Sequence, residues 1–456
     1  MVPGTTSDGI TDFTITQSAS DYPLASFERL PAEILLQIVT KLYSLDLLWS
    51  LMRASPRVWK IFDHHALEVT EGILSGPESI YPTEIQEVIR NVILVRSRIF
   101  PYRNLQEFKL SFKTAAVRTP LRSGEAHVPI GPERLLCAAV TSTVLRSVVA
   151  TASHILALSQ ACLASALTRI RSPSFAPLHC TDPKPTYGPL SPDSFPHNHP
   201  GFTQPRAWDR EFSGTPFKVV DAGQPSWVED MRALRAMWVL QLIGEAHGIF
   251  DGWAHAPDWP SDDVEQLQRL SPVELFNLGD FSSTLYAEEA TSALQFLNML
   301  GEVTSDTYCR LPRAPVLDEG SKWIVALPKK RVKKGLRLLG NGPFKAPLFN
   351  DEFIWGQTAD ALRGESSGVG AVRSLNSFGN SPIKGVTFDP FRPFGFAFWD
   401  RKRLHQLGLY PGIEEKGQFD DSYMFTWQSV LEPELVAAIR ADLRREHRRS
   451  SGEPLQ

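Results

Sequence analysis

The most concentrated run of apolar residues lies near the N-terminus, in the stretch ERLPAEILLQIVTKLYSLDLLWSL of residues 28–51. If residues 31–43 form a helix with about 100° between successive residues, their apolar side chains cover roughly 200° of its circumference. A helix that packs on a single core needs an apolar face only somewhat wider than about 100°. The pattern therefore predicts a helix with one apolar face in the core and a second apolar face available for another contact.

Proline and capping residues predict where the helices of this stretch begin. Leu30-Pro31 places proline in the first turn of the first helix, where its missing N–H breaks no hydrogen bond. Asp46 is expected to cap the second helix, and Ser55-Pro56 is expected to open a third helix that ends near residue 63. These signals predict three short helices that form a small unit.

Helical periodicity continues along most of the chain, whereas the alternation typical of strands is rare. Residues 321–327 (SKWIVAL) are the best strand candidate. Residues 172–225 hold 11 of the 35 prolines, a density that predicts a flexible loop or linker. Ser226 and Glu229 have capping-box spacing and predict that a helix begins after this loop. We expect a mainly α fold, with an N-terminal three-helix unit followed by a larger irregular helical domain with few or no strands.

A short helix is expected at residues 271–278. The expected organisation of the chain has six parts. The parts are a disordered lead-in (1–25), the three-helix unit (26–75), a helical region (76–171), the proline-rich flexible loop or linker (172–225), a second helical region (226–430), and a charged C-terminal helix and tail (431–456).

Composition and charge change this picture little. The chain has 42% hydrophobic residues, 21% charged residues and a net charge of −4, so it has no dominant attraction for nucleic acid or an anionic membrane. Residues 147–168 are long and uncharged enough to span a bilayer, but their Ser, Thr, His and Gln side chains favour a helix buried inside the protein. The four cysteines are scattered, which argues against a disulfide framework and a zinc site. We expect a soluble protein of the cytoplasm, the nucleus or both.

A basic run lies between residues 329 and 334. It resembles a nuclear import signal in which an extended lysine-rich segment binds an acidic groove, and the alternative is a solvated loop. The run is too short, and too poor in aromatic residues, to indicate nucleic-acid binding. Its basic residues are Lys329, Lys330, Arg331, Lys333 and Lys334.

The usual signatures of catalysis and of metal binding are missing from the sequence. It has no GxSxG, HExxH, kinase or phosphate-loop pattern. His197 and His199 lie one residue apart in FPHNHP and lack the spacing of zinc ligands. Acidic pairs such as Glu288-Glu289 match the first turns of helices or exposed faces. We therefore expect no enzyme activity, no metal and no cofactor.

Residues 30–62, LPAEILLQIVTKLYSLDLLWSLMRASPRVWKIF, resemble an F-box. The order, spacing and near-N-terminal position of the apolar residues agree with that family, although Trp49 and Ser55-Pro56 depart from its usual pattern. The matching residues are Leu30, Pro31, Glu33, Ile34, Leu35, Ile38 and Leu42 in the first part, and Asp46, Leu47, Leu48, Leu51, Ser55, Trp59 and Phe62 in the second.

The resemblance implies that the chain docks on the Skp-type adaptor of a cullin–RING ubiquitin ligase. Residues 226–430 would then hold an unidentified protein target. The residues expected to contact the Skp-type adaptor are Leu30, Pro31, Ile34, Leu35, Ile38, Leu42, Leu47, Leu48, Leu51 and Trp59.

Three alternatives remain open from the sequence. The second apolar face of the first helix could pack against residues 80–171 of the same chain. The protein could be a non-catalytic scaffold with an F-box-like unit and no role in ubiquitin transfer. It could also be a helical enzyme without a recognisable motif.

An aromatic segment punctuated by proline and glycine lies between residues 388 and 399. It is expected to plug the core, and the alternative is an exposed recognition surface. It resembles a segment of fungal F-box-like proteins, which implies no role. Its aromatic residues are Phe388, Phe391, Phe394, Phe396, Phe398 and Trp399.

Overall fold

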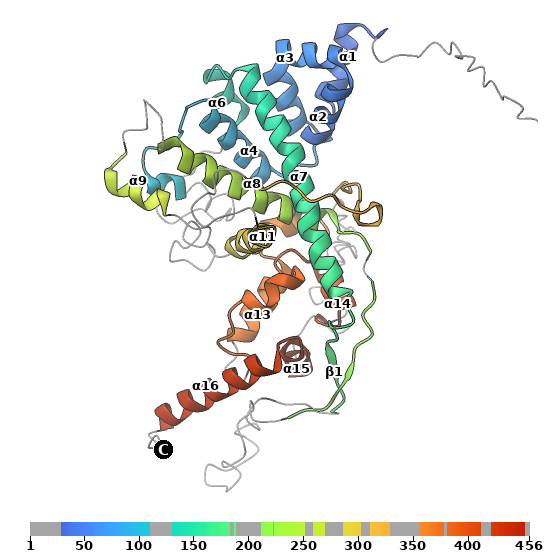
Figure 1. Ribbon diagram of the computed structural model, residues 1–456, viewed down its shortest axis with the longest axis vertical. Coiled ribbons are helices and arrows are strands. Elements are labelled where there is room, and N and C mark those ends of the chain that lie inside the picture. Colours follow the sequence, from blue (N-terminus) through green and yellow to red (C-terminus); the bar gives the residue numbers. More distant parts are fainter. Residues whose placement is uncertain are drawn as a thin grey trace, which may run out of the picture.

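The fold is mainly α-helical, as predicted (Figure 1). This computed structural model describes residues 29–109, 130–182, 187, 211–221, 223–250, 259–269, 286–301, 311–328, 355–377, 381–411 and 421–451. The N-terminal half contains α1 (Ala32–Thr40), α2 (Leu45–Ala54), α3 (Pro56–Ser75), α4 (Thr83–Arg96), α6 (Pro132–Cys137), α7 (Ser142–Ile170), β1 (Leu178–Cys180) and β2 (Gly214–Pro216). The C-terminal half contains α8 (Trp227–Phe250), α9 (Ser261–Gln268), α11 (Ala287–Met299), η6 (Glu319–Ser321), η7 (Ala359–Arg363), α13 (Ser367–Ser377), η8 (Asp389–Phe394), α14 (Arg401–Gln406), α15 (Asp421–Ser429) and α16 (Pro433–Ser451).

The three predicted N-terminal helices are present. α1 packs on α3, and α2 packs on both α3 and α7. The Ser55 side chain accepts a hydrogen bond of 3.2 Å from the Val58 N–H and caps α3 as expected. The predicted cap of α2 at Asp46 is wrong, because α2 begins at Leu45 after Ser44. The Leu45 N–H donates instead to the buried Tyr81 hydroxyl at 3.0 Å, a tertiary contact that local sequence does not show.

The third helix is longer than predicted. α3 continues to Ser75, with a single non-helical residue at His65 (φ −124°, ψ 27°). Its second half buries Val69, Ile73 and Leu74 in the core. This tertiary burial stabilises helix beyond the point where the local pattern predicts an end.

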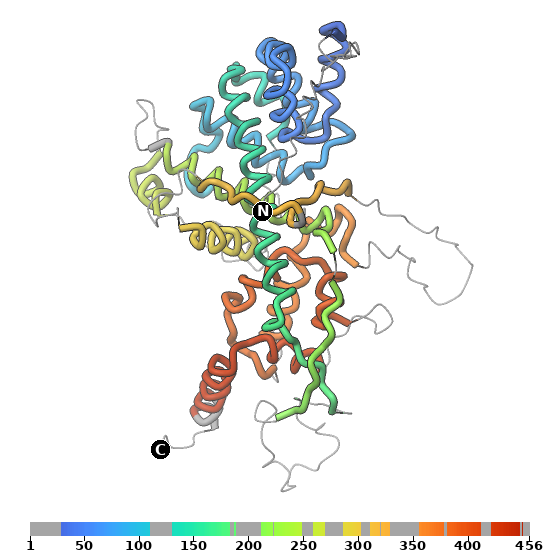
Figure 2. The backbone as a smooth tube through the Cα atoms, turned by 45° about the vertical axis from the view of Figure 1, so that its right-hand side comes forward, coloured from blue at the N-terminus to red at the C-terminus, as the bar shows by residue number. Residues whose placement is uncertain are grey.

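α7 is the central element of the molecule (Figures 1 and 2). It packs against α2, α3, α4, α8 and α11. Within the described part of the chain, it is the one helix long and apolar enough to cross a membrane. Val148, Ala152 and Ile155 are buried, in agreement with the predicted core helix of small residues.

α8 is buried around nearly its whole circumference. The apolar positions Met231, Leu234 and Trp238 are in the core, as their helical spacing predicts. Its polar positions are also buried, because α4, α7, α11 and η7 contact α8 from several sides. A helix of this kind has no polar face to solvent, so its charged residues need partners inside the protein.

The prediction that residues 172–225 contain no packed element is wrong for the ends of this segment. β1 and β2 pair antiparallel, with Leu178 opposite Pro216, and β1 contacts α15. Figure 2 shows these segments at the end of the molecule opposite α1. Phe175 and Tyr187 are buried, and Tyr187 meets Phe212 edge-to-face with ring centroids 4.8 Å apart. The middle of the predicted loop lies outside the described residues.

The predicted strand at 321–327 is not a strand. Trp323 and Val325 point into the core while Ile324 and Leu327 are exposed, so the segment has the alternation of a strand. No strand pairs with it among the described residues. The alternation of buried and exposed side chains therefore marks an extended segment here, but this segment does not pair with a described strand.

The aromatic segment 388–399 is part of the core, as expected. Phe391, Phe396 and Trp399 are fully buried, and the rings of Phe391 and Phe396 both meet Trp427 of α15 edge-to-face. One continuous set of buried apolar side chains extends through the described helices, from Leu35 in α1 to Leu443 in α16. The N-terminal helices thus share their core with the rest of the protein.

Candidate protein-binding surface

The outer face of α1 carries exposed apolar side chains. Ile34 and Ile38 expose 42% and 37% of their surface, and Pro31 is exposed just before the helix. Residues four apart lie above one another on a helix, so Ile34 and Ile38 form a row. The half-buried Leu30 lies before Pro31, outside the helix. We call Leu30, Pro31, Ile34 and Ile38 the outer row.

The inner face of α1 belongs to the core. Leu35 and Val39 are fully buried, and α1 packs on α3. Ile34 and Leu35 are thus adjacent in sequence but lie in opposite environments. The wide apolar stripe of the first helix is divided between the core and solvent.

α2 and the preceding turn add partly exposed side chains. Leu47 and Leu51 are half-buried and again four residues apart, and Leu42 in the turn is half-buried as well. Leu48 is fully buried. A partner that covers the outer row therefore has further apolar surface within the same three-helix unit.

The structure corrects the predicted contact set at two positions. Leu35 and Leu48 have no exposed surface, so a partner cannot touch them while the fold is intact. Their role is to pack α1 and α2 in place. The other eight predicted contact residues are exposed or half-buried: Leu30, Pro31, Ile34, Ile38, Leu42, Leu47, Leu51 and Trp59.

Trp59 is half-buried at a corner where α2, α3 and α7 meet. Its ring lies 6.3 Å from that of Trp49, and the Arg146 guanidinium of α7 lies over it at 4.8 Å from the ring centroid. Arg146 is also ion-paired with Asp63 of α3. The sequence did not predict this contact, because Arg146 is far from Trp59 along the chain.

Few charges surround the outer row, and they are of both signs: the exposed Arg29 precedes Leu30. Glu33 and Lys41, which are both exposed, carry opposite charges at the two ends of α1. Gln37, between Ile34 and Ile38 in sequence, is exposed and neutral. Attraction to this face therefore comes mainly from the burial of apolar surface.

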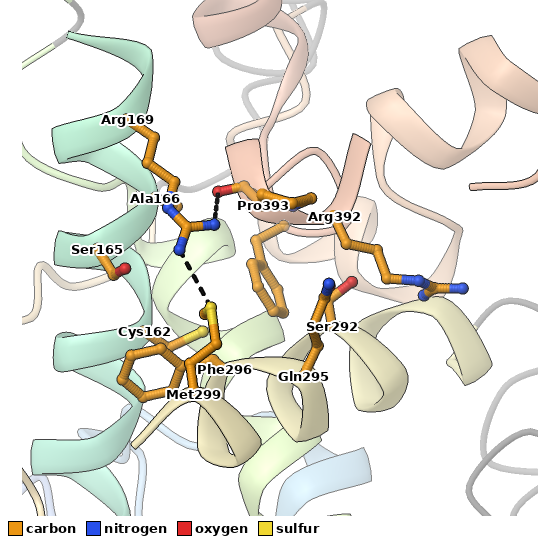
Figure 3. A pocket seen from close by; sticks show the side chains of 12 residues that line it. Cys162, Ser165, Ala166, Arg169, Ser292, Gln295, Phe296, Met299, Arg392 and Pro393 are labelled. Atoms are coloured by element: carbon orange, nitrogen blue, oxygen red, sulfur yellow. Dashed lines mark hydrogen bonds between the residues drawn. The ribbon is translucent and has the colours of Figure 1, made fainter. Parts of the chain in front are cut away.

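A second surface feature is a small pocket where α7, α11 and η8 meet (Figure 3). Its empty volume of about 280 Å³ includes open solvent in front of it, and very little of that space is enclosed. Arg169 of α7 donates to the carbonyl of Pro393 at 3.4 Å and to the sulfur of Met299 at 3.1 Å. Burial raises the pKa of the Cys162 thiol to about 12, so Cys162 contributes a neutral, apolar wall near pH 7.

Sequence reasoning missed the buried ion pairs of α8. Glu229 accepts two hydrogen bonds of 2.9 Å from Arg403, and Arg235 pairs with Glu289 at 2.7 Å. Burial, partly offset by Arg235 and Arg232, raises the pKa of Glu289 above its ordinary value. The sequence does carry a signal for these ion pairs, because Glu229, Arg232 and Arg235 recur every three positions within a mostly apolar helix. These pairs are enclosed, and we interpret them as structural.

Several predicted features lie outside the described residues: the basic run 329–334, the histidines of FPHNHP and the short helix at 271–278. Among the residues that are described, no three His, Cys, Asp or Glu side chains are grouped so as to hold a metal ion. Comparisons of the chain with protein-family models, with curated proteins and with solved structures found no match.

Proposed function

We propose that the protein is a substrate-recognition adaptor of a cullin–RING ubiquitin ligase of the SCF type. In this proposal the outer row of α1 docks on the Skp-type adaptor, in the cytoplasm or the nucleus. The observation that carries the proposal is the exposure of Ile34 and Ile38 on a helix whose opposite face, with Leu35, is already in the core. The resemblance of residues 30–62 to an F-box supplies the identity of the partner.

The apolar side chains that remain exposed on this face would contribute to binding when a partner covers them. Full burial of an aliphatic side chain contributes roughly 1.5–3 kcal/mol. Ile34 and Ile38 have 42% and 37% of their surface left to bury, so each contributes about 1 kcal/mol, and their half-buried neighbours add to this sum. Part of this gain is lost to association and to side-chain ordering.

The rest of the molecule would hold the target protein. α7 has 29 residues and extends from the three-helix unit toward β1 at the other end of the molecule (Figure 1). At 1.5 Å per residue this is roughly 43 Å, so the two ends can carry different partners. The protein would act without catalysis, by raising the effective concentration of a target lysine near the ubiquitin carrier.

The direct test mixes the full-length protein with a purified Skp-type adaptor and measures binding by calorimetry. The double variant Ile34→Ala, Ile38→Ala should bind at least about tenfold more weakly, because its outer row buries less apolar surface. The melting temperature should change little, since both side chains are exposed. Leu30→Ala with Pro31→Ala should have the same effect.

The matched control is Ile324→Ala with Leu327→Ala, which removes apolar side chains that expose 82% and 58% of their surface elsewhere on the molecule. This variant should bind the adaptor as the unmodified protein does. No complex with the unmodified protein would overturn the proposal. An equal loss in the control variant would also contradict it.

A further inference from the structure

The extended segment 322–327 crosses α7 on the surface of the molecule and is anchored there from one side (Figure 2). The indole N–H of Trp323 donates to the buried carboxyl group of Asp230 in α8 at 2.9 Å. The side chain of Gln160 in α7 donates to the Trp323 carbonyl, also at 2.9 Å. Trp323 and Val325 are buried. These contacts hold the segment in a defined position, although no described strand pairs with it.

The opposite edge of this segment is free. In an extended chain, the N–H and C=O of one residue point to the same side, and those of the next residue point to the other side. Because the Trp323 carbonyl faces Gln160 of α7, the N–H and C=O of Ile324 point away from α7. The backbone groups of Ile324 and Ala326 form no hydrogen bond with a described residue. Lys322, Ile324 and Ala326 are all exposed, so no described element covers this edge.

The side chains beside the free edge are apolar. Ile324 exposes 82% of its surface and Leu327 exposes 58%. Unpaired strand edges of this kind pair readily with other strands, and proteins commonly protect them with charges or proline. Here Lys322 and Pro328 lie at the two ends of the run, and the positions between them carry no charge. The edge therefore has the chemistry that recognises another extended chain.

We infer that residues 322–326 pair antiparallel with the same residues of a second copy of this chain. An edge with free donors and acceptors matches an identical edge when the two strands run in opposite directions about a twofold axis. With Ile324 at the axis, each Ile324 N–H donates to the Ile324 carbonyl of the other copy. Each Ala326 N–H then donates to the Lys322 carbonyl of the other copy. A second copy thus supplies the matching edge without any further component.

The neighbouring registers are less favourable. If Lys322 lay at the axis, two lysines would face each other and repel. If Ala326 lay at the axis, Ile324 would face Pro328, which has no N–H to donate. With Ile324 at the axis, two apolar side chains pack against each other on the outer face. This register also keeps the buried side chains of both copies on the inner face of the ribbon.

The test is the concentration dependence of the molecular mass of the full-length protein, measured by sedimentation equilibrium without any other protein. Two short strands bury less area than a stable interface does, so we expect a dissociation constant of about 10–100 µM. Ile324→Lys and Ile324→Glu should each weaken self-association at least about tenfold, because like charges would face each other at the axis. An equimolar mixture of the two variants should restore the dimer, because lysine then faces glutamate.

Val316→Lys is the matched control, since Val316 exposes 92% of its surface but lies before the paired residues. It should dimerise as the unmodified protein does. Melting temperatures should be equal for all of these variants, because both substituted side chains are exposed.

Three results would overturn the inference. They are a monomer throughout this concentration range, an equal loss in Val316→Lys and Ile324→Lys, and a mixture of the two Ile324 variants that stays monomeric. A monomer would assign the free edge to a strand of a different protein. Because the Skp-type adaptor is absent and the outer row lies on α1, the outcome is independent of the proposed function.

Discussion

The carboxyl group of Asp400 lies buried between α8 and α14. One oxygen accepts from the Arg403 N–H at 3.0 Å and caps α14, and the other accepts from the Ser226 hydroxyl at 2.8 Å and the Gln357 amide at 3.1 Å. Burial, and then the negative charge of Glu229, raises the pKa of Asp400 from 3.8 to about 6. At pH 7 the folded protein therefore holds a charge that its surroundings disfavour.

This environment predicts a pH dependence of stability at a single residue. Because the pKa of Asp400 is higher in the folded state, its contribution to the free energy of unfolding should rise as the pH falls from 7 toward 4, by no more than about 3 kcal/mol. Asp400→Asn should flatten this part of the curve of unfolding free energy against pH. Urea unfolding of both proteins at pH 7 and pH 5 measures the difference.

Asp389→Asn is the control for this experiment. Its hydrogen bond with Arg392 lowers the pKa of Asp389, so that the group stays ionised throughout this pH range. The slope between pH 7 and pH 5 should therefore remain that of the unmodified protein. Parallel curves for Asp400→Asn and the unmodified protein would show that the folded state does not perturb this carboxyl.

At the scale of elements, the position of α1 depends on a close approach to α3. A Cβ atom at Gly72 of α3 would lie 2.9 Å from the carbonyl oxygen of Thr40 and 3.1 Å from its Cβ. The end of α1 can reach this distance because residue 72 has no side chain. The outer row is thus held in place from the opposite side of the helix.

Gly72→Ala should lower the free energy of unfolding. The added methyl group forces the two helices apart at a cost of about 1–3 kcal/mol, which exceeds the gain in helix propensity of about 1 kcal/mol at most. Gly248→Ala in α8 is the matched variant, because no atom lies within 4 Å of a Cβ added there. It should be neutral or stabilising, and equal effects of the two variants in thermal melts would contradict the close contact.

At the scale of the whole molecule, the three-helix unit shares its core with α7. Both α2 and α3 pack on α7, and α7 in turn contacts α8 and α11. A unit of about 45 residues buries a smaller fraction of its surface on folding than a larger domain does, so its stability alone is marginal. Its stability therefore depends on helices that lie much later in the chain.

The isolated fragment 26–75 should consequently fold poorly. Circular dichroism of this fragment should show reduced helical signal and no cooperative thermal transition, whereas the full chain should melt cooperatively. Fragment 26–171, which adds α7, should recover part of the helical signal per residue. A sharp cooperative transition in fragment 26–75 would mean that the contacts with α7 contribute little to its stability.

The sequence by itself determined features that depend on residues within a few positions of each other. Ser55 caps α3, and Ser226 and Glu229 form the predicted capping box, with the Ser226 N–H donating to the Glu229 carboxylate at 2.8 Å. The helical spacing of apolar residues in α8 and the wide apolar face of α1 could also be predicted from the sequence. These features follow from helix geometry, which places residues three and four apart on one face.

The tertiary structure alone decided which apolar residues are exposed and which distant residues meet. It buried Leu35 beside exposed Ile34 and paired Glu229 with Arg403. Among the described residues, it placed no strand next to the alternating segment 321–327. It also assembled the pocket of Arg169 from three separate parts of the chain. Such contacts depend on how elements pack across long sequence distances, and no local pattern of hydrophobic residues specifies that packing.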